Sequence, residues 1–592
     1  MGKQSRLKAA RRMEREQADA RNPLAYLGFY TGVKAILGDR LNAAELTEHI
    51  GKFDWEHAFV SCASMASMIA NHREGLNADA VRHAALDPLL QPAPNGPIEP
   101  IRAHVREHYD QLIIAHEEVL SFLQHVIILH GGDGEPIAND FARSMWMLAA
   151  ADYLDRWSEA DARVLTKTEH LIAECAKASR FNRHSDPLRD VARVYLMFKD
   201  PPESGAFSDP QEWEALQRAA FGVPYDVHFE TRLFPLFMIS KGWGTGTTKH
   251  SELPVINRKT WSGIFKQDAA QVADWLSSVS VDRATLQAIT RSRLQTGTQL
   301  PHSPTALLHH PFVKFKDDFI AIASPWMMKA HLVGGVWAAF LAAARSMGDP
   351  LQWMRCFGYL FEGWLRRVAR MVPSTSTTKI VLASKIGGDD EVEDVVALEP
   401  GHAVLFSAKS KMVTEPVARW SASRSKVVDW YEEFFFSKKK GDQRGGAVRL
   451  LSARIDALRA GTFEKYGVSR ELHVIPVLVT FDDMGEDIHL YEWIEERCRT
   501  EGLLQQQAVS PLVLANVDEY ERIMAMTARQ ESISSFLRER DTTWRQRRIN
   551  VQLRSTRADD RFPEMVEAFN RVVNAMGQRT IAVMSDGSVT NE

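Results

Sequence analysis

The segment His473–Phe481 limits the possible folds of this chain more than any other stretch. It reads His-Val-Ile-Pro-Val-Leu-Val-Thr-Phe and is apolar almost throughout. A strand that is buried on both faces has such a continuous run, whereas a strand with one solvent face alternates apolar and polar residues. Because both faces of this strand must be covered, the sequence predicts a sheet between two layers of helices.

The surrounding segments predict the other elements of this sheet. Their order is α-β-β-β-α-β-α-β-α, where the second-to-last strand is His473–Phe481. The other predicted elements are helix Leu351–Met371, strands Lys379–Ala383, Val392–Leu398 and Ala403–Ala408, helices Ala447–Leu458 and Tyr491–Arg499, strand Leu512–Val517 and a helix beginning at Asp518.

The rest of the chain has a different pattern. Its 592 residues suggest about three or four domains, and the fold class is multidomain, with a helical N-terminal half and a C-terminal three-layer mixed sheet. A hairpin of His310–Phe315 and Phe319–Ile322, followed by helix Pro325–Ser346, is predicted in the middle. The predicted divisions are a basic tail 1–22, a helical domain 23–199, a mixed helical and linking domain 200–347, the sheet domain 348–555, and a C-terminal helix with a disordered tail 556–592.

Charge and cysteine content narrow the class of protein. The net charge is −4, so any nucleic-acid contact must come from local basic patches. The four cysteines are far apart, which fits a reducing compartment better than a disulfide framework. The apolar stretch Leu332–Ala344 is too short to cross a bilayer. We therefore expect a cytoplasmic protein with no membrane contact.

Three ionisable residues occupy notable places in this order of elements. Glu362 lies on the helix before the sheet, Asp394 enters the second predicted strand, and Lys409 closes the third. Carboxylate oxygens suit a hard cation such as Mg²⁺, and a lysine offsets charge on a phosphate. These residue types therefore fit hydrolysis of a phosphodiester, although each could also be an ordinary surface residue.

The arrangement resembles the PD-(D/E)XK, or restriction-endonuclease-like, nucleases over roughly Leu351–Ala525. That family has an α-β-β-β-α-β core, an Asp at the start of one hairpin strand, an acid-x-Lys triplet at the end of the next, and often a helix Glu. The resemblance implies a Mg²⁺- or Mn²⁺-dependent endonuclease acting on DNA, in antiviral defence or DNA processing. It implies that Asp394 and Glu362 bind the metal and that Asp394, Glu362 and Lys409 are catalytic.

Ser407 departs from the family pattern because it stands where the triplet has its acid. A neutral hydroxyl is a poor Mg²⁺ ligand, so one carboxylate must come from elsewhere. Glu391, Glu393 and Glu362 are candidates, and Glu362 is preferred because Glu393 points away from Asp394 in an alternating strand. The alternative is a catalytically inactive nuclease fold that binds nucleic acid or a protein partner.

Clusters of basic residues follow the motif in the sequence, and each could bind phosphates or could simply be solvated surface. Trp430 lies in one of these clusters and Arg538 in another. A homo-oligomer or a protein partner could use the helical N-terminal half. A third interpretation is a helical interaction protein whose C-terminal sheet is structural. The predicted nucleic-acid-binding residues are Lys411, Lys438, Lys439, Lys440 and Arg444.

Overall fold

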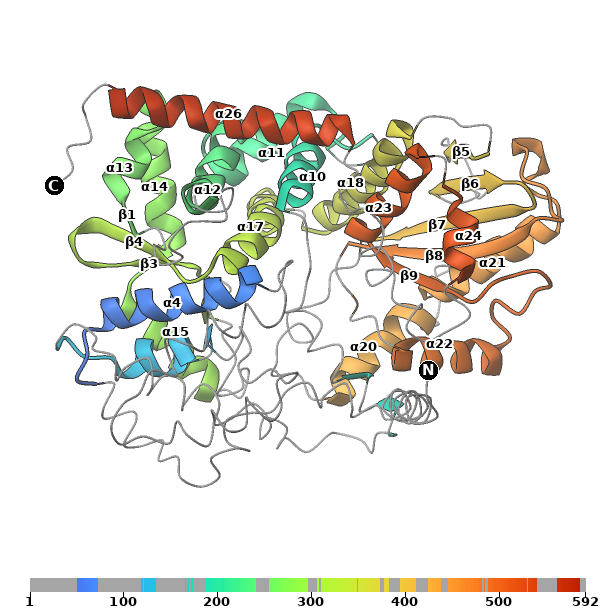
Figure 1. Cartoon of the computed structure of the whole chain (residues 1–592), viewed down its shortest axis with the longest axis horizontal. Helices are drawn as coiled ribbons and strands as arrows, with labels where there is room; N and C mark the ends of the chain where they lie inside the picture. The colour runs from blue at the N-terminus through green and yellow to red at the C-terminus, as the bar shows by residue number, and fades with distance from the viewer. Residues whose placement is uncertain are drawn as a thin grey trace, which may run out of the picture. The chain divides into compact units, whose positions relative to one another are not determined.

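The computed structural model describes most of the C-terminal half of the chain and parts of the N-terminal half. Its residues form a mixed α/β structure that is mostly helical and contains two mixed sheets (Figure 1). None of the helices in the described ranges is long and apolar enough to cross a membrane. The described ranges are 51–72, 119–134, 187–240, 255–295, 306–382, 394–410, 424–437, 446–539 and 562–585, with short gaps, and a few residues between 166 and 173.

The chain divides into two compact units. Unit 1 contains Met1–Glu159, Met238–Asn257 and Ser278–Met328, and unit 2 contains Ala160–Phe237, Arg258–Ser277 and Lys329–Glu592. Both units are therefore built from segments that are separated in the sequence.

Unit 1 contains a small sheet with the strand order β1-β4-β3-β2. β3 (Phe312–Lys314) and β4 (Phe319–Ile322) pair antiparallel, which confirms the predicted hairpin. β1 (Val255–Asn257) and β2 (Ser280–Val281) were not predicted, because segments of three and two residues are too short to have a periodicity. The described helices of this unit include α4 (Trp55–His72), a π-helix (Leu123–Ile128) and α15 (Arg283–Gln295).

Unit 2 contains the larger sheet, with the strand order β5-β6-β7-β8-β9. The pairs β5–β6 and β6–β7 are antiparallel, and β7–β8 and β8–β9 are parallel. The predicted strand His473–Phe481 is β8, the second-to-last strand, and its residues from Val474 to Thr480 are buried. The bounds are β5 (Lys379–Leu382), β6 (Val395–Glu399), β7 (His402–Lys409), β8 (His473–Thr480) and β9 (Val513–Asn516).

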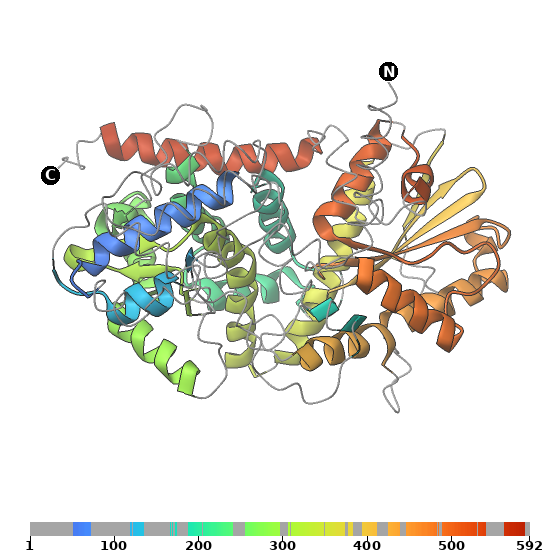
Figure 2. The same cartoon turned by 60° about the horizontal axis from the view of Figure 1, so that its bottom comes forward.

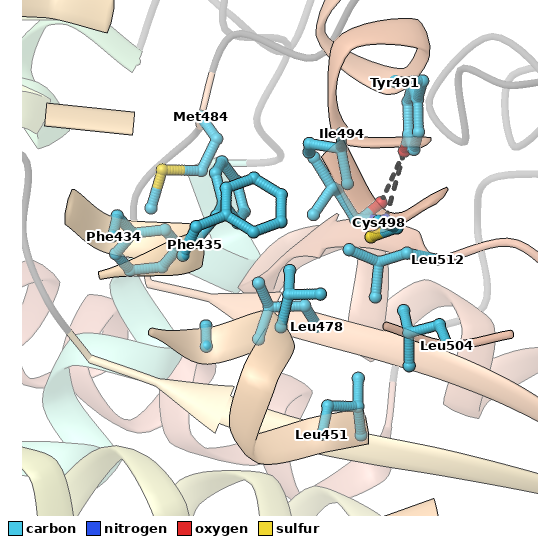
Figure 3. Packing of buried hydrophobic residues seen from close by; sticks show 14 of the residues in the cluster. Phe434, Phe435, Leu451, Leu478, Met484, Tyr491, Ile494, Cys498, Leu504 and Leu512 are labelled. Carbon is cyan, nitrogen blue, oxygen red and sulfur yellow. Dashed lines mark hydrogen bonds between the residues drawn. The ribbon is translucent and has the colours of Figure 1, made fainter. Parts of the chain in front are cut away.

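Helices cover both faces of this sheet (Figure 2). On one face, α18 (Pro350–Met371) and α23 (Val517–Ala528) pack against the strands, as the ring contact between Phe406 and Tyr520 illustrates. On the other face, Leu405 and Leu478 join an apolar cluster with α20 (Arg424–Phe436), α21 (Ala447–Arg459) and α22 (Ile488–Glu501) (Figure 3).

The helix α20 corrects the predicted order of elements, which had no helix between β7 and α21. Trp430 was grouped with basic residues as a possible phosphate-binding cluster, but it is 6% exposed and belongs to the apolar cluster. Its ring stacks on Phe434 one turn later, with centroids 5.2 Å apart. Trp430 is therefore a core residue of unit 2.

Further helices complete unit 2. α17 (Pro325–Ser346) has the predicted bounds and runs from unit 1 into unit 2. α10 packs beside both α18 and α26. The remaining described helices are α10 (Pro187–Lys199), α11 (Pro210–Phe221), α12 (Tyr225–Ser240), α13 (Arg258–Gly263), α14 (Ala269–Val279), α24 (Ile533–Glu539) and α26 (Pro563–Ser585).

Glu399, at the end of β6, fixes the start of α24 to the sheet. Its carboxylate accepts hydrogen bonds from the N–H groups of Ile533 and Ser534 and from the hydroxyls of Thr378, Ser532 and Ser534. Burial alone would raise the pKa of Glu399, but the hydrogen bonds from Ser532, Ser534 and Ile533 lower it below its usual value.

We expect Glu399→Gln to lower the free energy of unfolding at neutral pH by about 1–3 kcal/mol, because buried donors lose a charged acceptor. A carboxylate whose folded pKa is lowered stabilises the protein above the unfolded pKa of about 4.3 and loses this effect as the pH falls through the folded pKa. The difference between the variant and the parent should therefore shrink below about pH 4. Urea denaturation at several pH values measures it, with exposed Glu471→Gln as the control. Equal stability of parent and Glu399→Gln at pH 7 would contradict the assignment.

Candidate functional site

The predicted site residues lie at one end of the strands of the larger sheet, which we call its carboxyl edge. The parallel strands β7, β8 and β9 end there, at Lys409, Thr480 and Asn516. Because β6 runs antiparallel to β7, β6 begins at the same edge, directly after Asp394. Ligands of open α/β sheets commonly bind outside the carboxyl ends of the strands. Asp394 and Lys409 therefore belong to the edge where a ligand site is expected.

Asp394 is fixed to the end of β7. Its Oδ2 accepts a hydrogen bond from the backbone N–H of Ala408 at 2.7 Å, and the residue is half-buried. The pKa of Tyr520 on α23 is raised mainly by the burial of its hydroxyl and next by the negative charge of Asp394. The carboxylate thus lies within electrostatic reach of the Tyr520 hydroxyl.

Lys409 is the last residue of β7 and follows the amide that binds Asp394. It is half-buried, and its backbone lies beside Thr480 of β8. Among the residues that the structure describes, none forms a hydrogen bond or an ion pair with its ammonium. A cation at the same strand ends as Asp394 is suited to binding an anionic ligand.

Glu362 lies on the turn of α18 that covers this edge. The rings of Phe357 and Phe361 pack edge-on against Phe481, directly after β8, with centroids 5.0 and 5.6 Å apart. Gly358 approaches Ser410, the residue after Lys409, since a Cβ on Gly358 would lie 3.5 Å from the Ser410 Oγ. Glu362 is one helical turn after Gly358 and shares its face.

The Glu362 side chain is 34% exposed, and its Oε2 lies 3.9 Å from Nη2 of Arg366 on the same helix. A carboxylate at this exposure retains access to solvent and to ligands. The structure thus brings Asp394, Lys409 and the helix turn of Glu362 to the same edge.

Ser407 lies away from α18. It is 2% exposed, and by strand alternation it shares the face of Leu405, which packs against α20, α21 and α22. α18 covers the opposite face, so Ser407 and, by the same alternation, Lys409 lie on the other side of the sheet from Glu362. Glu391 and Glu393, the other candidate carboxylates, lie outside the described residues.

Arg538 does not join the candidate site. Its Nη1 lies 3.0 Å from Nε2 of His402, the first residue of β7. β7 runs from His402 to Lys409, so Arg538 belongs to the opposite edge of the sheet. The predicted nucleic-acid-binding residues Lys411, Lys438, Lys439, Lys440 and Arg444 lie outside the described residues.

Two buried residues of α23 next to the site were missed by the sequence analysis. Tyr520 is 0% exposed and Glu521 is 1% exposed at its side chain, and both contact α18. An ionisable residue within a helix resembles a surface residue in sequence, so its burial could not be inferred. The sequence does contain a signal for the start of this helix, because Asn516 and Glu519 have the spacing of a capping box, which they form in the structure.

Comparisons of the chain with protein-family models, with curated proteins and with solved structures each gave no match.

Proposed function

We propose that the protein is a metal-dependent nuclease acting on DNA, and that residues 350–528 have a restriction-endonuclease-like fold. The order of elements supports this fold: α18, an antiparallel β5–β6–β7 meander, helices, and then β8 parallel to β7. The resembled nucleases have the same α-β-β-β-α-β order. A role in antiviral defence or DNA processing is part of the proposal and rests on the resemblance.

The observation that carries the proposal is the hydrogen bond between the Asp394 carboxylate and the N–H of Ala408. It fixes the proposed metal ligand at the end of β7, next to the backbone of Lys409, where α18 carries Glu362. A carboxylate that the backbone already holds in place is preorganised for a charged substrate, and such preorganisation is the main source of electrostatic catalysis.

The donor set fits a hydrated Mg²⁺ better than a closed metal site. Within the described ranges there is no group of three or more His, Cys, Asp and Glu side chains that could hold a metal. Mg²⁺ in phosphoryl-transfer sites keeps several waters and uses only one or two carboxylates besides substrate phosphates. Asp394 and Glu362 can supply these two carboxylates, and Mn²⁺ can replace Mg²⁺.

Each residue then has a distinct task in phosphodiester hydrolysis. A cation held by Asp394 and Glu362 would lower the pKa of a water and offset charge on the phosphate. Asp394, whose Oδ2 accepts the Ala408 N–H, would help to hold the cation through its carboxylate. Lys409 orients the attacking water and stabilises the negative phosphoryl oxygens. The water oxygen bonds to phosphorus, one bridging P–O bond breaks, and the leaving oxygen takes a proton.

A second candidate function is a non-catalytic, nucleic-acid-binding nuclease fold. The buried Ser407 favours it, because the family's second acid is replaced by a neutral residue. Cleavage separates the two candidates. The parent protein is incubated with plasmid DNA and with single-stranded DNA in Mg²⁺, in Mn²⁺ and in EDTA. Cleavage that requires the metal supports the nuclease, whereas salt-sensitive DNA binding without cleavage supports the scaffold.

The basic residues between α20 and α21 in the sequence provide a test of DNA binding that does not depend on cleavage. Replacing Lys438, Lys439, Lys440 and Arg444 by Ala should weaken DNA binding. It should also flatten the slope of log affinity against log salt, by about 0.9 for each lost phosphate contact. Fluorescence anisotropy between low and moderate salt measures both effects. Arg218→Ala on α11 is the control, since Arg218 forms an exposed ion pair with Glu214. An unchanged slope in the fourfold variant would show that these basic residues do not contact DNA.

A further inference from the structure

Two consecutive residues of α23 bind α18 just beyond Glu362. The Tyr520 hydroxyl donates a hydrogen bond to the backbone oxygen of Leu365 at 2.8 Å. The Glu521 Oε1 accepts a hydrogen bond from Nε1 of Trp364 at 2.9 Å. Trp364 and Leu365 follow Glu362 within one helical turn, so both contacts act on the segment that carries the candidate metal ligand.

Glu521 is itself held by Arg193 of α10. Nε of Arg193 donates to Oε1 at 2.5 Å and Nη2 donates to Oε2 at 2.9 Å, while Nη1 binds Asp190 at 2.8 Å. Burial alone would lower the pKa of Arg193, but the charge of Glu521 and its hydrogen bond raise it above its ordinary value. This bidentate geometry leaves the Glu521 carboxylate little freedom to rotate.

Tyr520 also reaches the strands that carry the other site residues. Its ring packs edge-on against Phe406 of β7, with centroids 5.2 Å apart and planes at 78°. The Asp394 carboxylate is close enough to contribute to its raised pKa, after burial. One buried side chain therefore touches β7 and the backbone of α18 and lies near Asp394.

We propose that Tyr520 and Glu521 are positioning residues that set the place of Glu362 relative to Asp394, and that Arg193 holds Glu521 for this task. The proposal rests on the proposed nuclease function for its chemical meaning. Its geometric content is separate: the two hydrogen bonds prevent α18 from sliding or rotating over the end of β7. Groups that orient metal ligands typically contribute 10–100-fold to metal affinity or activity.

Helix α10, which precedes the sheet in the sequence, then has a role in the site. Arg193 lies on α10, far ahead of α18 in the sequence, and yet it determines the conformation of a carboxylate that binds α18. A nuclease core without α10 would leave Glu521 as a buried, unpaired charge. The helical segment is therefore needed for the geometry of the site.

The first measurement reports proximity and does not require activity. Cysteines are placed at 362 and 394 (Glu362→Cys, Asp394→Cys) in the full-length protein, and a short bifunctional thiosulfonate links them. Cys175 is replaced by Ser in this background and Cys62, Cys356 and Cys498 are buried, so mass spectrometry can assign the link to residues 362 and 394. Linking should be fast in this background and slower after Tyr520→Phe or Glu521→Gln. An absent link, or a rate that neither substitution changes, would overturn the proposal.

Tyr491→Phe is the matched control. Tyr491 is also buried, and its hydroxyl hydrogen-bonds the backbone of Leu514 at 3.2 Å, but it belongs to α22 on the other face of the sheet (Figure 3). Its removal should cost similar stability in thermal denaturation without changing the linking rate. If Tyr491→Phe slows linking as much as Tyr520→Phe, the effect is general loosening and the positioning role is rejected.

The second measurement connects the geometry to the site. With residues 362 and 394 intact, Tyr520→Phe should raise the Mn²⁺ dissociation constant by about 10–100-fold and lower kcat with little change in KM for DNA. Unchanged metal affinity and kcat, in a parent that does cleave DNA, would overturn the positioning role. A parent that neither binds Mn²⁺ nor cleaves DNA would instead reject the nuclease function, and the linking rates would still decide whether Tyr520 and Glu521 position α18.

Discussion

Asp394→Ala is expected to lower the rate of Mg²⁺-dependent DNA cleavage by roughly two orders of magnitude or more, as is typical for a group that stabilises transition-state charge. Glu362→Ala should be as damaging, because it removes the second of the two carboxylates available to the cation. Cleavage rates of the purified variants across a Mg²⁺ titration measure both effects. If Glu362→Ala cleaves like the parent while Asp394→Ala is inactive, Glu362 does not replace the missing acid.

Ser407 provides the matched comparison for these carboxylates. Ser407→Ala should change the cleavage rate much less, because a neutral, buried hydroxyl contributes little to binding a hard cation. Ser407→Glu introduces the acid that the resembled nucleases have here, but it places a carboxylate at a position that is 2% exposed, on the face packed against α20, α21 and α22. We therefore expect a loss of folding stability from this variant, since an unpaired charge is costly to bury.

Arg193→Ala is expected to lower the free energy of unfolding by about 3–5 kcal/mol, the usual cost of leaving the partner of a buried ion pair unpaired. The side chains of Arg193 and Glu521 are 5% and 1% exposed, so water cannot replace the lost contact. Urea denaturation measures the change. Arg218→Ala breaks an ion pair with side chains 74% and 67% exposed and should cost less than about 1 kcal/mol.

The double variant Arg193→Met, Glu521→Gln separates the charge from the packing. Met fills much of the volume of the arginine stem, and Gln keeps an oxygen that can accept the Trp364 indole N–H. Residue 521 then carries no charge, but the buried Asp190 still loses the Arg193 guanidinium, so part of the stability lost in Arg193→Ala should return. If the double variant is less stable than Arg193→Ala, or if Arg193→Ala matches Arg218→Ala, the buried pair does not have the assigned role.

Much of the larger sheet could be predicted from the sequence because its periodicities are local. The continuous apolar run of β8 indicated a strand buried on both faces, and the bounds of α17 and α18 agree with prediction within one residue. α20 was missed because its consecutive residues Phe434, Phe435 and Phe436 hide a helical period. All three are buried, since they meet a core that several other segments complete.

The candidate site was predictable only in part. Asp394 and Lys409 had to meet at one edge once their strands formed an antiparallel pair, and this follows from chain order alone. The burial of Ser407 and the contacts of Tyr520 and Glu521 with α18 depend on which helices cover each face. Arg193 and Glu521 are 328 residues apart in the sequence. No periodicity or spacing within either segment indicates such a pair.

The central claim is that the carboxyl edge around Asp394 and Lys409 hydrolyses DNA with a divalent cation. Its most direct test compares the parent with Asp394→Asn, which keeps the shape of the side chain and removes its charge, on end-labelled DNA across a Mg²⁺ titration. We expect Mg²⁺-dependent cleavage by the parent, abolished by EDTA and reduced by roughly two orders of magnitude or more in Asp394→Asn. Equal rates for the two proteins, or no metal-dependent cleavage by the parent, would contradict it.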